Sequence, residues 1–352
     1  MSGIRILGAG CARGDTEMTN ETLSLEIAEA LEEKGEPSSD FSDPVSGSRW
    51  IREKSGIERR WYAWEKTNAD MAAEAAENAI RDAGVRKEDI GILIVCTFTP
   101  DAAAPSTAST VAGQLGLGED LLAFDLNGAC SGFLYGLAAA DAFLADAPDR
   151  EAPLTDGSDR KSPPPEAGGT KCAPGKLALV IGSEKLSPYL DPSDPATAIL
   201  FGDGAGAVVL RHDETKPFRF RAGSCPDEEM LSCPRDGRGV RMKGQEVYRF
   251  AVGSVPEAVR TLLEKIGLRP EDADRFVLHQ SNERILDRTS RRLDLPEDKM
   301  FKNIRTWGNT SSASLAIALS EMKESGLLGE GERIVLCGYG AGMTYGAAVI
   351  TG

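Results

Sequence analysis

The sequence predicts an α/β protein that is built from two similar halves. Short apolar runs, which are typical of buried strands, alternate with amphipathic stretches at helical spacing over the 352 residues. In addition, the two halves end on the same series of elements: a helix rich in small residues, a buried strand, a Gly-rich turn and a last strand. A duplicated β/α unit is the simplest account of this pattern, with halves at 1–211 and 212–352.

The expected elements of the first half begin with a strand at 5–10. A helix follows at 20–34, because Leu23, Ile27 and Leu31 share one face and Gly35 ends the pattern. Polar residues then lead to Trp50. The remaining expected elements are an Ala-rich helix at 68–83, a buried strand at 91–98, a small-residue helix at 130–144, and strands at 177–182 and 204–210.

In the second half, a helix is expected to start at Ser254, because Ser254, Pro256 and Glu257 resemble a capping-box start. Its stop is expected at Gly267. The later elements are a strand at 275–279, helices at 282–295 and 311–326, and strands at 333–342 and 345–350. Residues 147–176 are rich in Pro, Gly and charge, which predicts a mobile loop insertion within the first half; a domain linker is the alternative.

Composition excludes several classes of function. With 40 basic and 55 acidic residues, the net charge of −15 argues against non-specific binding to nucleic acid or an anionic membrane. No apolar run approaches the roughly 18 residues of a membrane span. The seven cysteines are odd in number and form no CxxC pair, which favours a reducing cytoplasm. Only two histidines are present, so we expect no metal site.

The segment GAGCARG (8–14) resembles a dinucleotide-binding fingerprint. Its sixth position is Arg13 rather than Gly or Ala, and no helix is expected directly after it. A Rossmann-type nucleotide site is therefore not expected.

Three residues are candidates for chemistry. Cys130 stands at the expected start of a helix among small neighbours, where unpaired backbone N–H groups favour a thiolate; the alternative is a buried small hydrophobe. His279 ends a strand and precedes polar residues, so its ring is expected at a sheet edge, although a structural histidine would look the same. Asn309 precedes the second small-residue helix, where it could be an ordinary N-cap.

Several motifs, in order and over almost the whole chain, resemble those of β-ketoacyl-ACP synthase III, the initiating condensing enzyme with the thiolase fold. They are WIREKSGIERR, TFTPDAAAPSTA, DLNGACSGFLYGL, ILFGDGAGAVVL, MKGQEVYRFAV, HQSNERI, GNTSSAS and GYGAGMTYG. The insertion at 147–176 falls outside the match. The resemblance implies two βα halves stacked as five layers, α-β-α-β-α.

The resemblance also implies a mechanism. Cys130 would take an acyl group from a thioester. Malonyl would then lose CO₂, and side chains of His279 and Asn309 would donate hydrogen bonds to the enolate oxygen. The backbone amides of Cys130 and Ala341 would form the oxyanion hole of the acyl-enzyme; the family usually has Gly at position 341. No metal or redox cofactor is implied.

For substrates, the resemblance implies acyl-CoA and acyl carrier protein (ACP). Pantetheine and adenine contacts map to Trp50, Lys54, Gln245, Tyr248 and Asn282. The docking site for the carrier protein maps to a basic helix face. The residues of this face are Arg284, Arg288, Arg291 and Arg292. The alternative is an ordinary helix face that is only solvated.

The chain departs from the family pattern at three substrate positions. Lys54 and Pro195 stand where many members have Arg, which would weaken a guanidinium clamp on CoA. Ala104 stands where a bulky residue often closes the acyl tunnel of the partner subunit in a homodimer. These departures favour medium or long acyl groups over acetyl.

The leading interpretation is a cytoplasmic homodimer that catalyses decarboxylative Claisen condensation of an acyl-CoA or acyl-ACP primer with malonyl-ACP, giving 3-oxoacyl-ACP. Two alternatives remain. One is a related acyltransferase of secondary metabolism with a different acceptor. The other is a non-catalytic protein that only shapes a complex, against which the intact Cys130, His279 and Asn309 argue.

Overall fold

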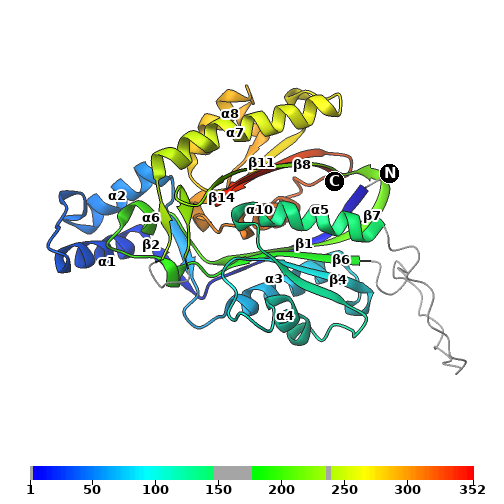
Figure 1. Cartoon of the computed structure of the whole chain (residues 1–352), viewed down its shortest axis with the longest axis horizontal. Coiled ribbons are helices and arrows are strands. Elements are labelled where there is room, and N and C mark those ends of the chain that lie inside the picture. Colours follow the sequence, from blue (N-terminus) through cyan, green and yellow to red (C-terminus); the bar gives the residue numbers. More distant parts are fainter. Residues whose placement is uncertain (1–2, 146–176, 235–238) are drawn as a thin grey trace, which may run out of the picture.

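Two five-stranded mixed sheets lie one above the other in the computed structural model, which describes residues 3–145, 177–234 and 239–352 (Figure 1). The first sheet has the order β1 (Gly3–Arg13), β7 (Gly204–Pro217), β6 (Leu177–Glu184), β4 (Ile90–Cys96) and β5 (Leu122–Leu126). The second has the order β12 (Met300–Phe301), β11 (Arg275–Leu278), β13 (Arg333–Gly340), β14 (Gly342–Thr351) and β8 (Arg219–Asp227).

Helices fill three layers around these sheets (Figure 1). Between the sheets lie α5 (Gly132–Ala145) and α10 (Ala313–Glu324), whose apolar residues join one core with strands of both sheets. The outer face of the first sheet is covered by α3 (Asn68–Ala83) and α4 (Thr107–Leu115). The outer face of the second is covered by α7 (Gly244–Lys265) and α8 (Glu283–Arg292). The five layers expected from the sequence are therefore present.

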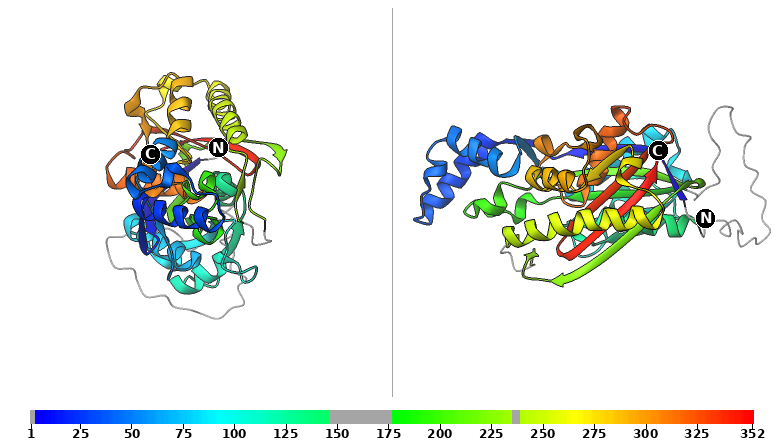
Figure 2. Two further views of the ribbon diagram at one scale, coloured as in Figure 1. Left: turned by 90° about the vertical axis from the view of Figure 1, so that its left-hand side faces the viewer. Right: turned by 90° about the horizontal axis from the view of Figure 1, so that it is seen from above.

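The remaining elements gather mainly at one end, where α1 and α2 project (Figure 2). They are β2 (Thr16–Thr19), α1 (Asn20–Glu33), α2 (Pro44–Ser55), β3 (Arg59–Tyr62), α6 (Pro195–Ala198), β9 (Leu231–Ser232), β10 (Arg241–Met242) and α9 (Ile304–Trp307). Over the described ranges, no helix has the length and apolar character needed to cross a bilayer.

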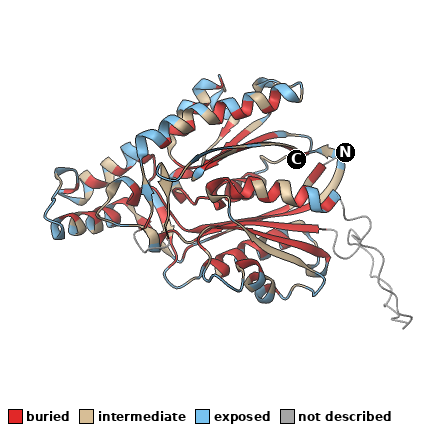
Figure 3. Ribbon diagram, viewed as in Figure 1, coloured by how far each residue is buried: buried red, intermediate tan, exposed pale blue. Residues whose placement is uncertain are grey.

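Two glycines of the first sheet let the central helix α10 pack closely against it. A Cβ atom added to Gly182 of β6 would lie 2.4 Å from the carbonyl oxygen of Ser312, and one added to Gly206 of β7 would lie 2.4 Å from the amide of Ile317. Only glycine lets the backbone of α10 approach the first sheet this closely. Most residues of α5 and α10 are buried, and the exposed ones lie at the C-terminal ends of these helices (Figure 3).

The sequence expectations hold for several elements. Helix α3 spans the predicted residues, with a capping box between Thr67 and Asp70 and a left-handed Gly84 at its end. The GAG of residues 8–10 lies inside β1 rather than in a turn, because Gly8 and Gly10 let α3 pack directly on the strand. This placement agrees with the expected lack of a Rossmann site.

The predicted helix start at Ser254 is wrong. Helix α7 begins ten residues earlier, at Gly244, and runs through Pro256. Proline has no amide N–H, so the carbonyl oxygen of Val252 loses its partner within the helix. Nη1 of Arg292, on the neighbouring helix α8, donates a hydrogen bond to that oxygen instead. A tertiary contact thus replaces the missing bond, which the local sequence could not reveal.

The boundary expected between residues 211 and 212 falls within β7, which continues to Pro217. The chain passes to the second sheet between Pro217 and Arg219. Helices α2 and α4 and strand β8 were not expected, because their sequences are polar or lack a clear apolar period. The expected insertion at 147–176 lies outside the described residues.

Candidate active site

Cys130 lies in the short 3₁₀ helix η3 (Ala129–Ser131), which leads directly into α5. The end of β13 presses against it: a Cβ atom on Gly340 would lie 2.7 Å from the Cys130 amide nitrogen. Glycine at this position brings the following turn, with Ala341, beside the cysteine. Ala341 and Cys130 line one cavity.

His279 follows β11, and its ring is buried. Nδ1 lies 2.7 Å from the hydroxyl oxygen of Ser314 in α10. Burial lowers the pKa of His279 to about 3, so the imidazole is neutral. A neutral ring held from one side can present its other nitrogen to a ligand.

Asn309 precedes α10 and is also buried. Its Oδ1 atom accepts a 2.9 Å hydrogen bond from the amide of Ser311. With the oxygen committed in this way, the side-chain NH₂ group is left to donate elsewhere. Asn309 is not the N-cap of α10, since that position is held by Ser312. It lines one cavity of about 670 Å³ together with Cys130 and His279.

The same cavity contains residues that the sequence assigned to pantetheine, adenine and carrier contacts: Trp50, Lys54, Gln245, Tyr248, Asn282 and Arg284. At its mouth the Lys54 ammonium lies 5.5 Å from the centre of the Trp50 ring, and the Asn282 amide donates to the Lys54 carbonyl over 3.0 Å. Pro195 begins α6, whose Ala196 is part of the wall. The cavity thus runs from exposed side chains down to Cys130.

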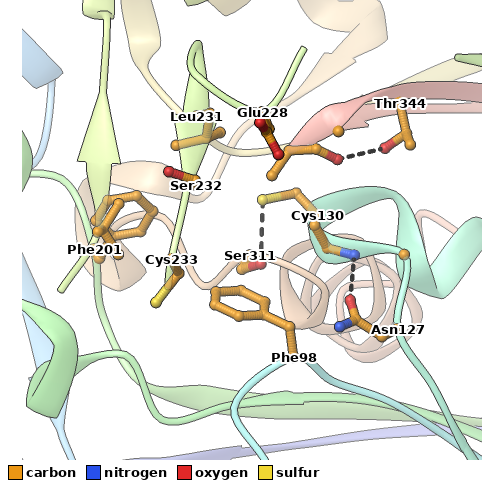
Figure 4. A pocket seen from close by; sticks show the side chains of 15 residues that line it. Phe98, Asn127, Cys130, Phe201, Glu228, Leu231, Ser232, Cys233, Ser311 and Thr344 are labelled. Atoms are coloured by element: carbon orange, nitrogen blue, oxygen red, sulfur yellow. Dashed lines mark hydrogen bonds between the residues drawn. The ribbon is translucent and has the colours of Figure 1, made fainter. Parts of the chain in front are cut away.

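A second cavity, of about 460 Å³, also includes Cys130 (Figure 4). Its wall is largely apolar, with Phe98, Phe201, Leu231 and Val240 among its residues. Cys130 therefore lines both cavities. Ala104 is exposed and lines neither of them.

The basic residues of α8 differ in their surroundings. All four arginines are exposed. Arg284 lines the larger cavity. Arg291 donates to the carbonyl of Asp287 over 3.2 Å, and Arg292 donates to α7 as described above. The structure therefore ties Arg292 to helix packing.

One electrostatic expectation is not met. The helix start was expected to favour the Cys130 thiolate, yet burial raises the pKa of the thiol to about 12. The hydrogen bond between Cys130 and Ser311 counteracts this, but loss of hydration is the larger effect. The thiol therefore needs a proton acceptor when it reacts.

Sequence reasoning missed Glu184, Ser311 and Ser314. Glu184 ends the buried strand β6 and is fully buried beneath the cysteine region, with Ser311 between them. An acidic residue directly after an apolar strand, in LALVIGSE, was the available signal. Among the described residues, no group of three or more His, Cys, Asp or Glu side chains is placed to hold a metal ion.

Family models match the second half more fully than the first. Residues 263–351 match the C-terminal model of 3-oxoacyl-[ACP] synthase III, and residues 172–225 match a further model of 3-oxoacyl-[ACP] synthase III. Over 353 residues the chain is 36% identical to the β-ketoacyl-[ACP] synthase III of Aquifex aeolicus, covering 99% of each chain. A relative from Halalkalibacterium halodurans is 35% identical over 348 residues, covering 98% of this chain and 97% of that protein.

Solved structures agree with these sequence matches. The Aquifex aeolicus synthase III superposes with a TM-score of 0.83 at 34% identity, covering 99% of this chain and 100% of the other. The synthase III of Pseudomonas aeruginosa gives 0.82 at 30% identity, covering 99% and 98%. A priming β-ketosynthase of the R1128 polyketide pathway is more distant, with 0.81 at 28% identity and coverage of 99% and 96%.

Two stacked β/α halves, with a cysteine, a histidine and an asparagine around one deep cavity, define a condensing acyltransferase of the thiolase fold. Within this class, the chain belongs to the β-ketoacyl-ACP synthase III family. It is thus a condensing enzyme of fatty acid biosynthesis, and ACP and CoA thioesters are the substrates of its family.

Proposed function

We propose that this enzyme stores an acyl primer on Cys130 and condenses it with malonyl-ACP, releasing CO₂ and 3-oxoacyl-ACP. The observation that carries this assignment is that Cys130 lines both cavities. The pantetheine arm would enter through the larger cavity, and the acyl chain would occupy the smaller, apolar one. An acyl thioester on Cys130 joins the two compartments.

In the proposed first step, the backbone amides of Cys130 and Ala341 donate to the oxyanion that forms on the thioester. Ala341 fits this role, since its turn is held beside Cys130 by the close approach of Gly340. An amide donor needs no particular side chain, so Ala in place of the usual Gly is compatible with the proposal.

In the proposed second step, His279 and Asn309 donate to the enolate oxygen of the decarboxylating malonyl group. Both side chains border the cavity that contains Cys130. His279 is held by Ser314 of α10, and Asn309 is held by Ser311 in the turn before α10. Donors that are fixed before the reaction stabilise developing charge without reorganising. A transfer to an alcohol or amine acceptor would not need this enolate pair.

Three further proposals concern the oligomeric state, the docking site for ACP and the cellular compartment. The enzyme works as a homodimer, in which exposed residues 101–105 and the edge strand β5 face the partner. ACP docks on Arg284, Arg288 and Arg291 beside the larger cavity. The seven cysteines without a CxxC pair favour a reducing cytoplasm.

Acylation of Cys130 is the direct test. After mixing with an acyl-CoA, mass spectrometry is expected to show one added acyl mass on the peptide that contains Cys130. Cys130→Ala is expected to remove that mass while its circular dichroism spectrum stays unchanged. An acyl group on another residue, or acylation of the folded alanine variant, would refute the proposal.

A further inference from the structure

Glu184 is a fully buried carboxylate for which the proposed mechanism has no use. Its Oε2 atom accepts hydrogen bonds from the hydroxyls of Thr97 and Thr99, at 3.1 and 2.6 Å, and from the amides of Phe98 and Thr99, at 3.2 Å each. None of these donors is cationic. Such a shell supports a negative charge without a salt bridge, which leaves the carboxylate able to accept a proton.

The other oxygen of Glu184 faces the active site. Oε1 accepts from the hydroxyl of Ser312 at 2.8 Å and from that of Ser311 at 3.3 Å. Of these two serines, Ser311 also contacts the nucleophile: its hydroxyl oxygen lies 3.1 Å from the Cys130 sulfur. The hydroxyl of Ser312 instead lies 2.7 Å from the carbonyl oxygen of Cys96, which shares the single Ser312 proton with Oε1 of Glu184.

The direction of the hydrogen bonds follows from the chemistry of the groups. An ionised carboxylate can only accept, so the Ser311 hydroxyl donates to Glu184 and keeps its lone pairs for the thiol proton of Cys130. The Ser311 backbone holds this arrangement, since its φ of 49° lies in the left-handed region and its amide is bound by Asn309. The contact is thus built into the turn before α10.

The ionisation states agree with this geometry. Burial raises the pKa of Cys130 to about 12, which means that the thiol has to lose its proton during attack. Burial lowers the pKa of His279 to about 3, so its ring is a weak base. Burial raises the pKa of Glu184 to about 7, which makes it the stronger base of the two.

We propose that Glu184, acting through the hydroxyl of Ser311, takes the proton of Cys130 as the acyl group is transferred. The sulfur forms a bond to the thioester carbonyl carbon while its proton moves to the Ser311 oxygen and the Ser311 proton moves to Oε1 of Glu184. The bond from carbon to the CoA sulfur then breaks, and solvent protonates the departing CoA thiolate. When condensation releases Cys130 as a thiolate, the same route returns the stored proton.

Few titratable groups could disturb this carboxylate. Cys96, at the end of β4, and Cys130 face it, and burial raises the pKa of Cys96, which keeps that thiol neutral. The adjacent Lys185 directs its ammonium to the carbonyl of Lys66 at 2.9 Å. The contacts from the segment 97–99 and from the start of α10 are hydroxyls and amides. A single inflection is therefore expected.

The test compares two neighbouring serines, both buried and both bonded to Glu184. Single-turnover acylation by acyl-CoA is measured by mass spectrometry between roughly pH 5 and 9 for the wild type, Ser311→Ala and Ser312→Ala. Because the ionised carboxylate is the active form, the wild-type rate constant is expected to fall as the pH drops through about 7. Thermal unfolding shows whether each variant is folded.

Ser311→Ala is expected to slow acylation by about 10²-fold and to lose the inflection. Ser312→Ala is expected to keep the inflection and move it to higher pH, because a donor that favours the ionised carboxylate is gone. Equal behaviour of the two folded variants, or an unchanged inflection in Ser311→Ala, would overturn the inference. It rests on the proposed function, and a wild-type enzyme that takes no acyl group would overturn both.

Discussion

Nδ1 of His279 and the hydroxyl oxygen of Ser314 lie 2.7 Å apart. The amide of Gln280 donates to the same oxygen at 3.4 Å, so the hydroxyl proton of Ser314 is free to point at the imidazole. If Nδ1 accepts, the hydrogen of the neutral ring sits on Nε2, the nitrogen on the other side. In this tautomer His279 is a hydrogen-bond donor toward the cavity.

The first prediction concerns Ser314→Ala. Without the hydroxyl, the ring loses its preference for the Nε2–H form, and condensation is expected to slow about tenfold, less than the 10²–10³-fold expected for loss of a donor. Acylation of Cys130 is expected to stay at the wild-type rate. Single-turnover condensation of pre-acylated enzyme with malonyl-ACP measures the effect. Wild-type condensation would show that Ser314 does not set the tautomer.

The second prediction concerns Asn309→Ala. Loss of its side-chain donor is expected to lower the rate of decarboxylation and condensation by about 10²–10³-fold. The variant is still expected to accept an acyl group, because Asn309 does not contact the oxyanion of the first step in our proposal. Release of CO₂ from malonyl-ACP gives the readout. Near-normal condensation would remove Asn309 from the site.

The third prediction separates carrier docking from helix packing on α8. Arg288→Glu is expected to raise the KM for malonyl-ACP about tenfold, equivalent to about 1.4 kcal/mol, without changing acylation by acyl-CoA. Arg292→Ala is the matched comparison. It removes the hydrogen bond to Val252 and is expected to lower the free energy of unfolding by about 1 kcal/mol. A normal KM in Arg288→Glu would place ACP elsewhere.

The fourth prediction concerns the oligomeric state. Strand β5 is an edge strand of the first sheet, and an unpaired strand edge is a template for pairing with a second copy. An obligate interface of this kind is expected to bury more than about 2,000 Å². Sedimentation is expected to show a dimer at micromolar concentration. A stable, active monomer under these conditions would contradict the prediction.

The fifth prediction concerns the primer. The cavity of about 460 Å³ beyond Cys130 is large for an acetyl group, and Ala104 of a partner subunit would leave its far wall open. Each further CH₂ buried there is worth about 0.8 kcal/mol. We expect a higher kcat/KM for octanoyl-CoA than for acetyl-CoA, and a shift toward short chains in Ala104→Phe. A clear preference of the wild type for acetyl would refute this.

The local sequence was sufficient to predict an element where neighbouring residues determine its ends. Thr67, Asp70 and Gly84 define the ends of α3, because caps and left-handed turns depend on neighbouring residues. It failed at α7. There, Pro256 looked like a helix start, whereas a contact with Arg292, distant in sequence, supplies the bond that proline removes.

By itself the sequence determined the two-part α/β plan and singled out Cys130, His279 and Asn309, since periodicity and motifs are properties of short segments. Only the tertiary structure decided that these residues share one cavity and that Glu184 is linked to Cys130 through the hydroxyl of Ser311. It also decided the ionisation of the cysteine. A helix start favours a thiolate, but the burial that opposes it arises from all the segments packed around the sulfur, which no single segment encodes.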